Sequence, residues 1–197
     1  MTSPPASVHD ALIVVDVQRD FLPGGALGVA AGESVIAPLN ACSEALARAG
    51  ARIYATRDWH PPDHCSFQAQ GGPWPTHCVA GTAGAEFPAT LRLPRGAVVV
   101  SKAERRDRDA YSGFDGTDLA SQLRAADVTR LWIGGLATDY CVRATVLDAR
   151  RLGFEVLVLT DAVRAVELNA GDGARALADM QAAGARLQPG GPTGPGP

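Results

Sequence analysis

The sequence predicts an α/β protein of three layers (α-β-α), with helices on both faces of a doubly wound, mainly parallel sheet of about six strands. Short apolar runs alternate with helix-patterned stretches along most of the chain, which is typical of parallel strands joined by crossover helices. The length of 197 residues suits one ordinary domain with a sizeable core. A hydrophobic fraction of 46% and a charged fraction of 20% are typical of globular proteins.

The individual elements follow from local patterns. Apolar residues recur at helical spacing from Val35 to Leu46, and this helix is expected to end at Gly50. Leu119 and Leu123 mark a second helix. Two later helices are expected at residues 141–152 and 174–183. The expected strands are residues 11–15, 52–56, 97–101, 130–134 and 155–159, and a short sixth strand is compatible with 185–187.

The domain is expected to span residues 11–187. Residues 1–10 form an N-terminal extension that lacks the basic start and apolar stretch of a signal peptide. The tail, residues 188–197, is dominated by Pro and Gly; it cannot build a core and is expected to be disordered.

Charge and cysteine content bear on the expected partners and compartment. A net charge of −3 provides no basic surface, so nucleic acid is not expected as a partner. No uncharged apolar run approaches the length of a membrane span, so no membrane association is expected. The four cysteines have no regular spacing, which favours reduced thiols in the cytoplasm, with metal or catalytic roles, over disulfides. The sequence leaves open whether the chain forms a homo-oligomer.

Residues 58–95 are too long for an ordinary connection, and loops of this length in compact domains are usually functional. Three of the four histidines lie in this segment. Asp58 and His60 are two residues apart, so in extended chain their side chains leave on the same face, and His64 and His77 can fold back onto them. Three imidazoles and one carboxylate suit a divalent transition metal. The alternative is a solvated loop that is rich in histidine.

Further reactive residues follow the ends of the other expected strands. Asp16 follows the first strand, Lys102 the third, and the fourth runs into a segment that ends at Cys141. Ligands of open parallel sheets bind beyond the carboxyl ends of the strands, so these side chains are expected to meet at one edge.

Cys141 is expected in the first turn of a helix, with Thr138 or Asp139 as N-cap. There the helix dipole stabilises a thiolate, and free amide N–H groups could hold a developing oxyanion. The alternative for Cys141 is a small buried hydrophobe, which is the interpretation that we adopt for Cys42.

Lys102 is unusual directly after a β-rich run, because burial of an ammonium group is costly. Pairing with Asp16 beside the thiol would explain it, and a solvated lysine at the start of a loop is the alternative. Residues 104–109 are read as a solvated loop of mixed charge.

From about residue 11 to 187, the chain resembles the nicotinamidase/pyrazinamidase branch of the isochorismatase-like cysteine hydrolases. An Asp, Lys and Cys in this order would indicate only the superfamily, whereas the metal-binding pattern points to the nicotinamidase branch. The segments that carry the resemblance are residues 14–21, 24–27, 56–60, 63–67, 74–82, 111–114 and 135–142.

The resemblance implies roles for particular residues. It implies a catalytic triad of Asp16, Lys102 and Cys141, and an oxyanion hole at Ala137 and Cys141 beside a cis peptide bond between Leu136 and Ala137. The implied metal ligands are Asp58, His60, His64 and His77, and the implied walls of the substrate pocket are Phe21, Trp74 and Tyr111.

The resemblance also implies an activity. The chain would be a metal-dependent amidohydrolase that converts nicotinamide, and also pyrazinamide, to the acid and ammonia through a thioester, in NAD salvage. Its cofactor would be one divalent transition metal (Zn, Fe or Mn), and its partner a small amide. Two alternatives remain: a related cysteine hydrolase that acts on another small amide, and a metal-binding protein without catalysis. The second would not need Asp16, Lys102 and Cys141 together.

Overall fold

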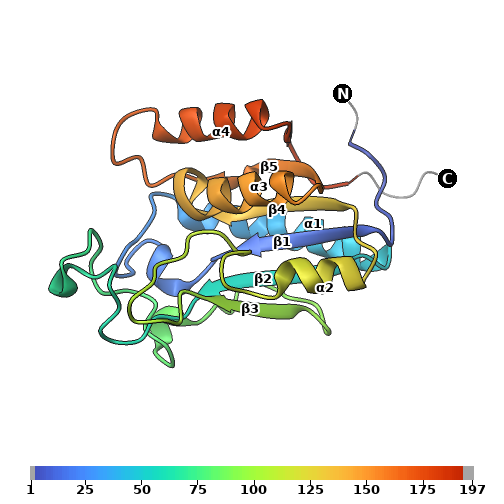
Figure 1. Ribbon diagram of the computed structural model, residues 1–197. Helices are drawn as coiled ribbons and strands as arrows, with labels where there is room; N and C mark the ends of the chain where they lie inside the picture. Colours follow the sequence, from blue (N-terminus) through green and yellow to red (C-terminus); the bar gives the residue numbers. More distant parts are fainter. Residues whose placement is uncertain (1–2, 193–197) are drawn as a thin grey trace.

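The computed structural model describes residues 3–192, which form a parallel sheet in the order β3-β2-β1-β4-β5-β6 (Figure 1). The strand order reverses between β1 and β4, so the predicted doubly wound sheet is confirmed. The strands are β1 (Asp10–Val15), β2 (Arg52–Asp58), β3 (Val98–Lys102), β4 (Arg130–Leu136), β5 (Glu155–Arg164) and β6 (Arg186–Gln188).

Helices cover both faces of the sheet, as predicted (Figure 1). Side chains alternate along β1, so that Ile13 packs with one core cluster and Leu12 with the other. The Leu12 cluster includes the apolar side of α1 (Ile36–Arg48). The Ile13 cluster includes residues of α2 (Leu119–Ala125), α3 (Arg143–Arg151) and α4 (Asp172–Ala182).

Most elements lie within two residues of their expected bounds, and two differ more from the sequence prediction. Strand β5 continues five residues beyond the expected 155–159, because its pairing with β4 shifts register between Ile133 and Gly135 and then resumes at Val163. The polar residues at the shift hide this continuation in the sequence. The helix expected at 141–152 begins earlier, with a π-helical turn (Thr138–Val142) that leads into α3.

Both domain boundaries also shift. Asp10, expected in the extension, opens β1 and is buried, with Arg130 Nε and Nη2 donating hydrogen bonds to its carboxylate at 2.8 and 2.7 Å. Gln188, expected in the tail, ends β6, and the Gly190 N–H donates to Asp161 Oδ1 at 3.0 Å. Strand pairing and these bonds extend the ordered fold past both expected limits. Residues 1–2 of the extension and 193–197 of the tail lie outside the described residues.

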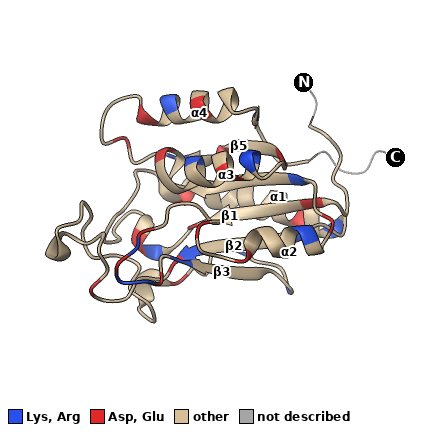
Figure 2. Cartoon of the chain, viewed as in Figure 1, with Lys and Arg blue, Asp and Glu red and all other residues tan. Residues whose placement is uncertain are grey.

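The surface carries charges of both signs. Figure 2 shows basic and acidic residues mixed along α4 and along the loop that follows β3. Within residues 3–192, no helix has the length and apolarity required to cross a bilayer.

The long connection between β2 and β3 lies at the carboxyl end of the sheet, and the described ends of the chain lie at the opposite end (Figure 1). Its helical structure is confined to two short 3-10 turns, Gln68–Gln70 and Ala83–Ala85. At the same end, Gly135 has a φ of 131°, and a Cβ there would collide with the backbone of Val15. Only glycine therefore allows β1 and β4 to approach each other where the strand order reverses.

Candidate active site

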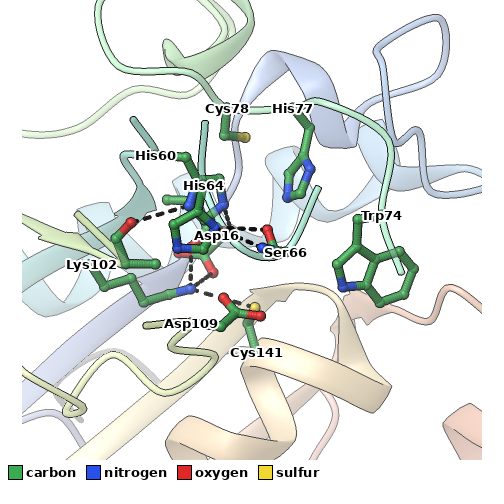
Figure 3. A network of polar contacts seen from close by, with 12 residues as sticks. Asp16, His60, His64, Ser66, Trp74, His77, Cys78, Lys102, Asp109 and Cys141 are labelled. Carbon is green, nitrogen blue, oxygen red and sulfur yellow. Dashed lines mark hydrogen bonds and ion pairs between the residues drawn. The ribbon is translucent and has the colours of Figure 1, made fainter. Parts of the chain in front are cut away.

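Three reactive side chains from three strand ends meet at this edge of the sheet. The Lys102 Nζ lies 3.0 Å from Asp16 Oδ2 and 3.6 Å from Cys141 Sγ (Figure 3). All three residues are buried, with exposed fractions of 0% for Asp16, 2% for Lys102 and 6% for Cys141. The predicted convergence of Asp16, Lys102 and Cys141 therefore exists in the structure, and it lies where the strand order reverses.

Asp16 is positioned by an unusual backbone conformation. Its φ of 48° turns the chain out of the sheet directly after β1, a conformation that Asp tolerates better than most residues. Thr56 Oγ1 donates a hydrogen bond to Asp16 Oδ1 at 2.6 Å. Within the described chain, Oδ2 has its ion pair with Lys102 but no hydrogen bond of good geometry. Asp16 Oδ2 thus keeps a lone pair for a proton from the neighbouring thiol.

Lys102 is a buried cation held by anions, which excludes the alternative of a solvated lysine. Its Nζ contacts Asp58 Oδ1 at 2.5 Å and donates to the Ala110 carbonyl at 3.0 Å, in addition to Asp16. Burial alone would lower the pKa of Lys102, but Asp16 and Asp58 outweigh it and raise this pKa well above its usual value. Lys102 therefore stays charged beside the thiol.

The Cys141 thiol lies within the π-helical turn that leads into α3, in the first turn of the helical segment where the sequence places it. Burial raises the pKa of Cys141 well above its usual value, Lys102 opposes this shift, and Asp16 adds to it. Burial also raises the pKa of Asp16. The raised pKa of Cys141 favours the thiol over the thiolate, so the sulfur needs a neighbouring base before it can attack.

The sequence suggested Asp139 as an N-cap of the turn that carries Cys141, but Asp139 does not cap this turn. Its carboxylate accepts hydrogen bonds from the N–H groups of Val166 at 2.9 Å and Glu167 at 3.0 Å. Thr138 shows no side-chain capping bond either, because it is the first residue of the turn and Ala137 occupies the N-cap position. The peptide bond between Leu136 and Ala137 is cis, as the resemblance implies.

A second group of buried side chains fits a divalent metal. Potential ligand atoms of Asp58, His60 and His77 all lie within 4.8 Å of one another. His60 Nδ1 donates to the Ala103 carbonyl at 3.2 Å, and His77 Nδ1 donates to the Pro75 carbonyl at 2.7 Å. These bonds place the proton on Nδ1, so each ring has a free lone pair on Nε2. Two imidazole nitrogens and a carboxylate form a donor set for Zn, Fe or Mn.

His64, the expected fourth ligand, has a different place in the structure. Its Nε2 lies 3.1 Å from the Arg108 carbonyl, which can only accept, so this nitrogen carries the proton. Its Nδ1 lies 2.8 Å from Ser66 Oγ and accepts from the Ser66 N–H at 3.3 Å. Both nitrogens are occupied, and the ring stacks on His60 with centroids 4.2 Å apart. His64 therefore supports His60 from outside the cluster of three.

Both groups open into one cavity, which contains the expected aromatic walls. Trp74 Nε1 donates to the Tyr111 hydroxyl at 3.0 Å, which fixes two of these walls relative to each other. Phe21 lies against His77, with ring centroids 5.5 Å apart. The residues that line the cavity are Phe21, Leu27, Val29, Asp58, His60, Ser66, Trp74, His77, Asp109, Tyr111, Ala137, Tyr140, Cys141 and Val166.

Residues 10–189 match the family model of the isochorismatase domain. The chain belongs to the isochorismatase family. It is 39% identical to the nicotinamidase of Escherichia coli, over 90% of this chain and 93% of that protein. The crystal structure of a pyrazinamidase of Pyrococcus horikoshii in complex with zinc has a TM-score of 0.88 and 52% identity, over 92% of this chain and 99% of the other. A structure of PnC1 from L. infantum in complex with nicotinate has a TM-score of 0.89 and 39% identity, over 96% of both chains.

The sequence pattern does not indicate several of the residues that line the cavity of this isochorismatase-family protein. Asp109, which the sequence places in a solvated loop, lines the cavity, because the chain turns inward before Ala110 and the Ala110 carbonyl accepts from Lys102. Tyr140 packs edge-on against Trp74, with ring centroids 5.0 Å apart. In the sequence, only its position next to Cys141 indicates that Tyr140 could line the cavity. Nothing in the local sequence points to Val166, which reaches the cavity through its bond to Asp139.

Proposed function

We propose that this protein hydrolyses nicotinamide, and also pyrazinamide, to the corresponding acid and ammonia through a thioester on Cys141. One observation carries the proposal: a buried Asp16, Lys102 and Cys141 group adjoins the same aromatic-walled cavity as the Asp58, His60 and His77 cluster. The similarity to a nicotinamidase and to a nicotinate-bound structure supports the choice of a pyridine carboxamide.

The chemistry follows from the arrangement of Asp16, Lys102 and Cys141. Asp16 Oδ2 accepts the thiol proton, and the sulfur attacks the carboxamide carbon. The N–H groups of Ala137 and Cys141 are assigned to the developing oxyanion. Asp16 returns its proton to the nitrogen as the C–N bond breaks, so ammonia leaves and a thioester remains. Water then hydrolyses the thioester, which releases the acid and restores the thiol. Lys102 keeps its charge throughout and offsets the negative charge on Asp16 or sulfur.

Asp58, His60 and His77 would hold the metal, and we omit His64 from the ligand set. A bound divalent cation would supply a Lewis-acidic position that orients the pyridine nitrogen, directly or through a water. The zinc in the pyrazinamidase structure supports a divalent ion, and the donor set also suits Fe or Mn.

We place the reaction in NAD salvage and in the cytoplasm. Nicotinamide is the pyridine that NAD-consuming reactions release, and its hydrolysis returns nicotinate for reuse. All four cysteines are free thiols, which supports a reducing compartment.

The direct test is ammonia release from nicotinamide by the purified protein, before and after treatment with a chelator and after Zn²⁺ is restored. We expect activity that falls on chelation and returns with the metal. Pyrazinamide should also be hydrolysed, and an aliphatic amide should be a poor substrate because it lacks the ring that the aromatic walls enclose. Hydrolysis of the aliphatic amide alone would favour the alternative of another small-amide hydrolase.

His77→Ala should weaken metal binding and nicotinamide binding together. Substitution outside the first coordination shell already costs about 10–100-fold in metal affinity, so removal of a direct ligand should cost at least this much. Nicotinamide should lose more affinity than benzamide, which lacks the ring nitrogen. Both affinities are measured in a Cys141→Ala background, which prevents turnover. Equal losses for the two compounds would show that the metal site does not recognise the ring nitrogen.

Trp74→Ala should weaken nicotinamide and benzamide to similar extents. The indole gives contacts that both rings share, and loss of such an apolar contact costs about 1.5–3 kcal/mol. Binding is again measured in the Cys141→Ala background. Metal affinity serves as the internal control and should be unchanged, because Trp74 is not in the metal cluster. A loss restricted to nicotinamide would assign Trp74 a role in recognition of the ring nitrogen.

A further inference from the structure

Asp58 is the one residue that the metal cluster shares with the group around Cys141. Its carboxylate belongs to the His60 and His77 cluster and also lies within 4.8 Å of the reactive atoms of Asp16 and Cys141. The position of its backbone therefore affects both halves of the site. The Asp58 backbone has to be held in place at a point where β1 no longer pairs with β2.

The ladder between β1 and β2 ends just before Asp58. The last registered pair is Val15 with Thr56, and the last backbone bond runs from the Asp16 N–H to the Thr56 carbonyl at 3.2 Å. The positive φ of Asp16 then turns β1 away. In a continued parallel ladder, the Asp58 N–H would donate to the Asp16 carbonyl, and the Gln18 N–H to the Asp58 carbonyl.

The Gln18 side chain makes these two bonds in place of the backbone. Its Oε1 accepts from the Asp58 N–H at 2.8 Å, and its Nε2 donates to the Asp58 carbonyl at 2.8 Å. The Asp16 carbonyl, released from the ladder, accepts the Gln18 N–H at 2.9 Å. Gln18 is fully buried, and its Nε2 also donates to the Ala85 carbonyl at 2.9 Å. Both polar atoms of the Gln18 carboxamide, Oε1 and Nε2, therefore have hydrogen-bond partners.

We propose that Gln18 is a positioning residue, whose carboxamide replaces the missing β1 peptide and holds Asp58 in the geometry that the metal cluster requires. Asp58 is held by β3 on its other side through pairing with Lys102, so Gln18 completes its support. Without the carboxamide, the Asp58 peptide would lose its partner on the β1 side and its carboxylate would lose its fixed position. This inference rests on the proposed metal site.

Asn40 provides a matched control. It is also a buried amide, and it also holds a loop through backbone bonds, donating to the Thr90 carbonyl at 2.9 Å and accepting from the Arg92 N–H at 2.8 Å. It lies on α1, away from the cavity residues. A general effect of losing a buried amide should therefore appear equally at Gln18 and Asn40.

The experiment measures Zn²⁺ affinity by competition with a chelator, for the parent protein, Gln18→Met and Asn40→Leu. Both changes replace an amide by an apolar side chain of similar size. We expect Gln18→Met to bind Zn²⁺ at least tenfold more weakly than the parent, and Asn40→Leu to stay within twofold. All measurements are made well below the melting temperature of each variant.

If Gln18→Met does not fold, Gln18→Glu and Asn40→Asp take their places. The Glu variant keeps an acceptor for the Asp58 N–H but loses the donor. Its added negative charge would by itself favour a cation, so weaker Zn²⁺ binding would have to come from displacement of Asp58. Affinity within twofold of the parent, or an equal loss in the Asn40 variant, would overturn the proposal. A parent protein that binds no Zn²⁺ would instead overturn the proposed metal site.

Discussion

Cys141→Ala should abolish ammonia release from nicotinamide, with a loss of roughly four orders of magnitude or more in kcat. The thiol is the side chain that forms the bond to the carboxamide carbon in the proposed chemistry, and alanine leaves no substitute. Zn²⁺ should remain bound, because the sulfur lies outside the Asp58, His60 and His77 cluster. Ammonia release and metal content are measured on the same preparation.

Cys65→Ala is the matched control for the thiol. Cys65 is a half-buried free cysteine in the loop after β2, and it does not line the cavity. Its substitution should leave both activity and metal content near those of the parent. Retained turnover in Cys141→Ala, or a loss of turnover confined to Cys65→Ala, would reassign the nucleophile.

Asp16→Asn should lower kcat by roughly 10²–10⁴-fold, the contribution typical of a positioned acid or base. Burial raises the pKa of Cys141, so at neutral pH the thiol depends on Asp16 to remove its proton. An amide cannot accept this proton. Alkylation of Cys141 by iodoacetamide at neutral pH should therefore slow as well, and this readout is independent of substrate binding.

Asp10→Asn separates loss of the base from loss of a buried carboxylate. Asp10 is buried at the opposite end of β1, where it pairs with Arg130. We expect lower thermal stability in this variant, but an unchanged rate of Cys141 alkylation in the folded protein. Alkylation of Asp16→Asn at the rate of the parent would show that Lys102 alone generates the thiolate.

The sequence was sufficient to predict the sheet and the convergence of the triad. Apolar runs identify strands, and the carboxyl ends of parallel strands share one edge, so residues such as Asp16 and Lys102 had to approach each other. The same logic placed Asp58 and His60 together, because their spacing of two residues puts both on one face of an extended chain.

Features that depend on tautomers and on distant partners could not be predicted. His64 has the same side chain as His60, and only the Arg108 carbonyl, 44 residues away in sequence, shows that its Nε2 is protonated. The bond from Val166 to Asp139 spans 27 residues. The Cys141 pKa depends on the balance between burial and Lys102, whereas the sequence showed only a helix terminus. Each of these three properties depends on a contact that forms only when the chain folds.

The two oxygens of Asp58 face different partners, with Oδ1 on Lys102 at 2.5 Å and Oδ2 toward His60 Nε2 at 3.7 Å. A cation in the cluster would share this carboxylate with Lys102, and so weaken the hold of Asp58 on the ammonium group beside the sulfur. Binding at the cluster and ionisation of the thiol would then be thermodynamically linked, and the coupling free energy would be the same whichever event occurs first. Nucleophile and cation site would then respond to each other as a single cooperative unit, connected by one carboxylate.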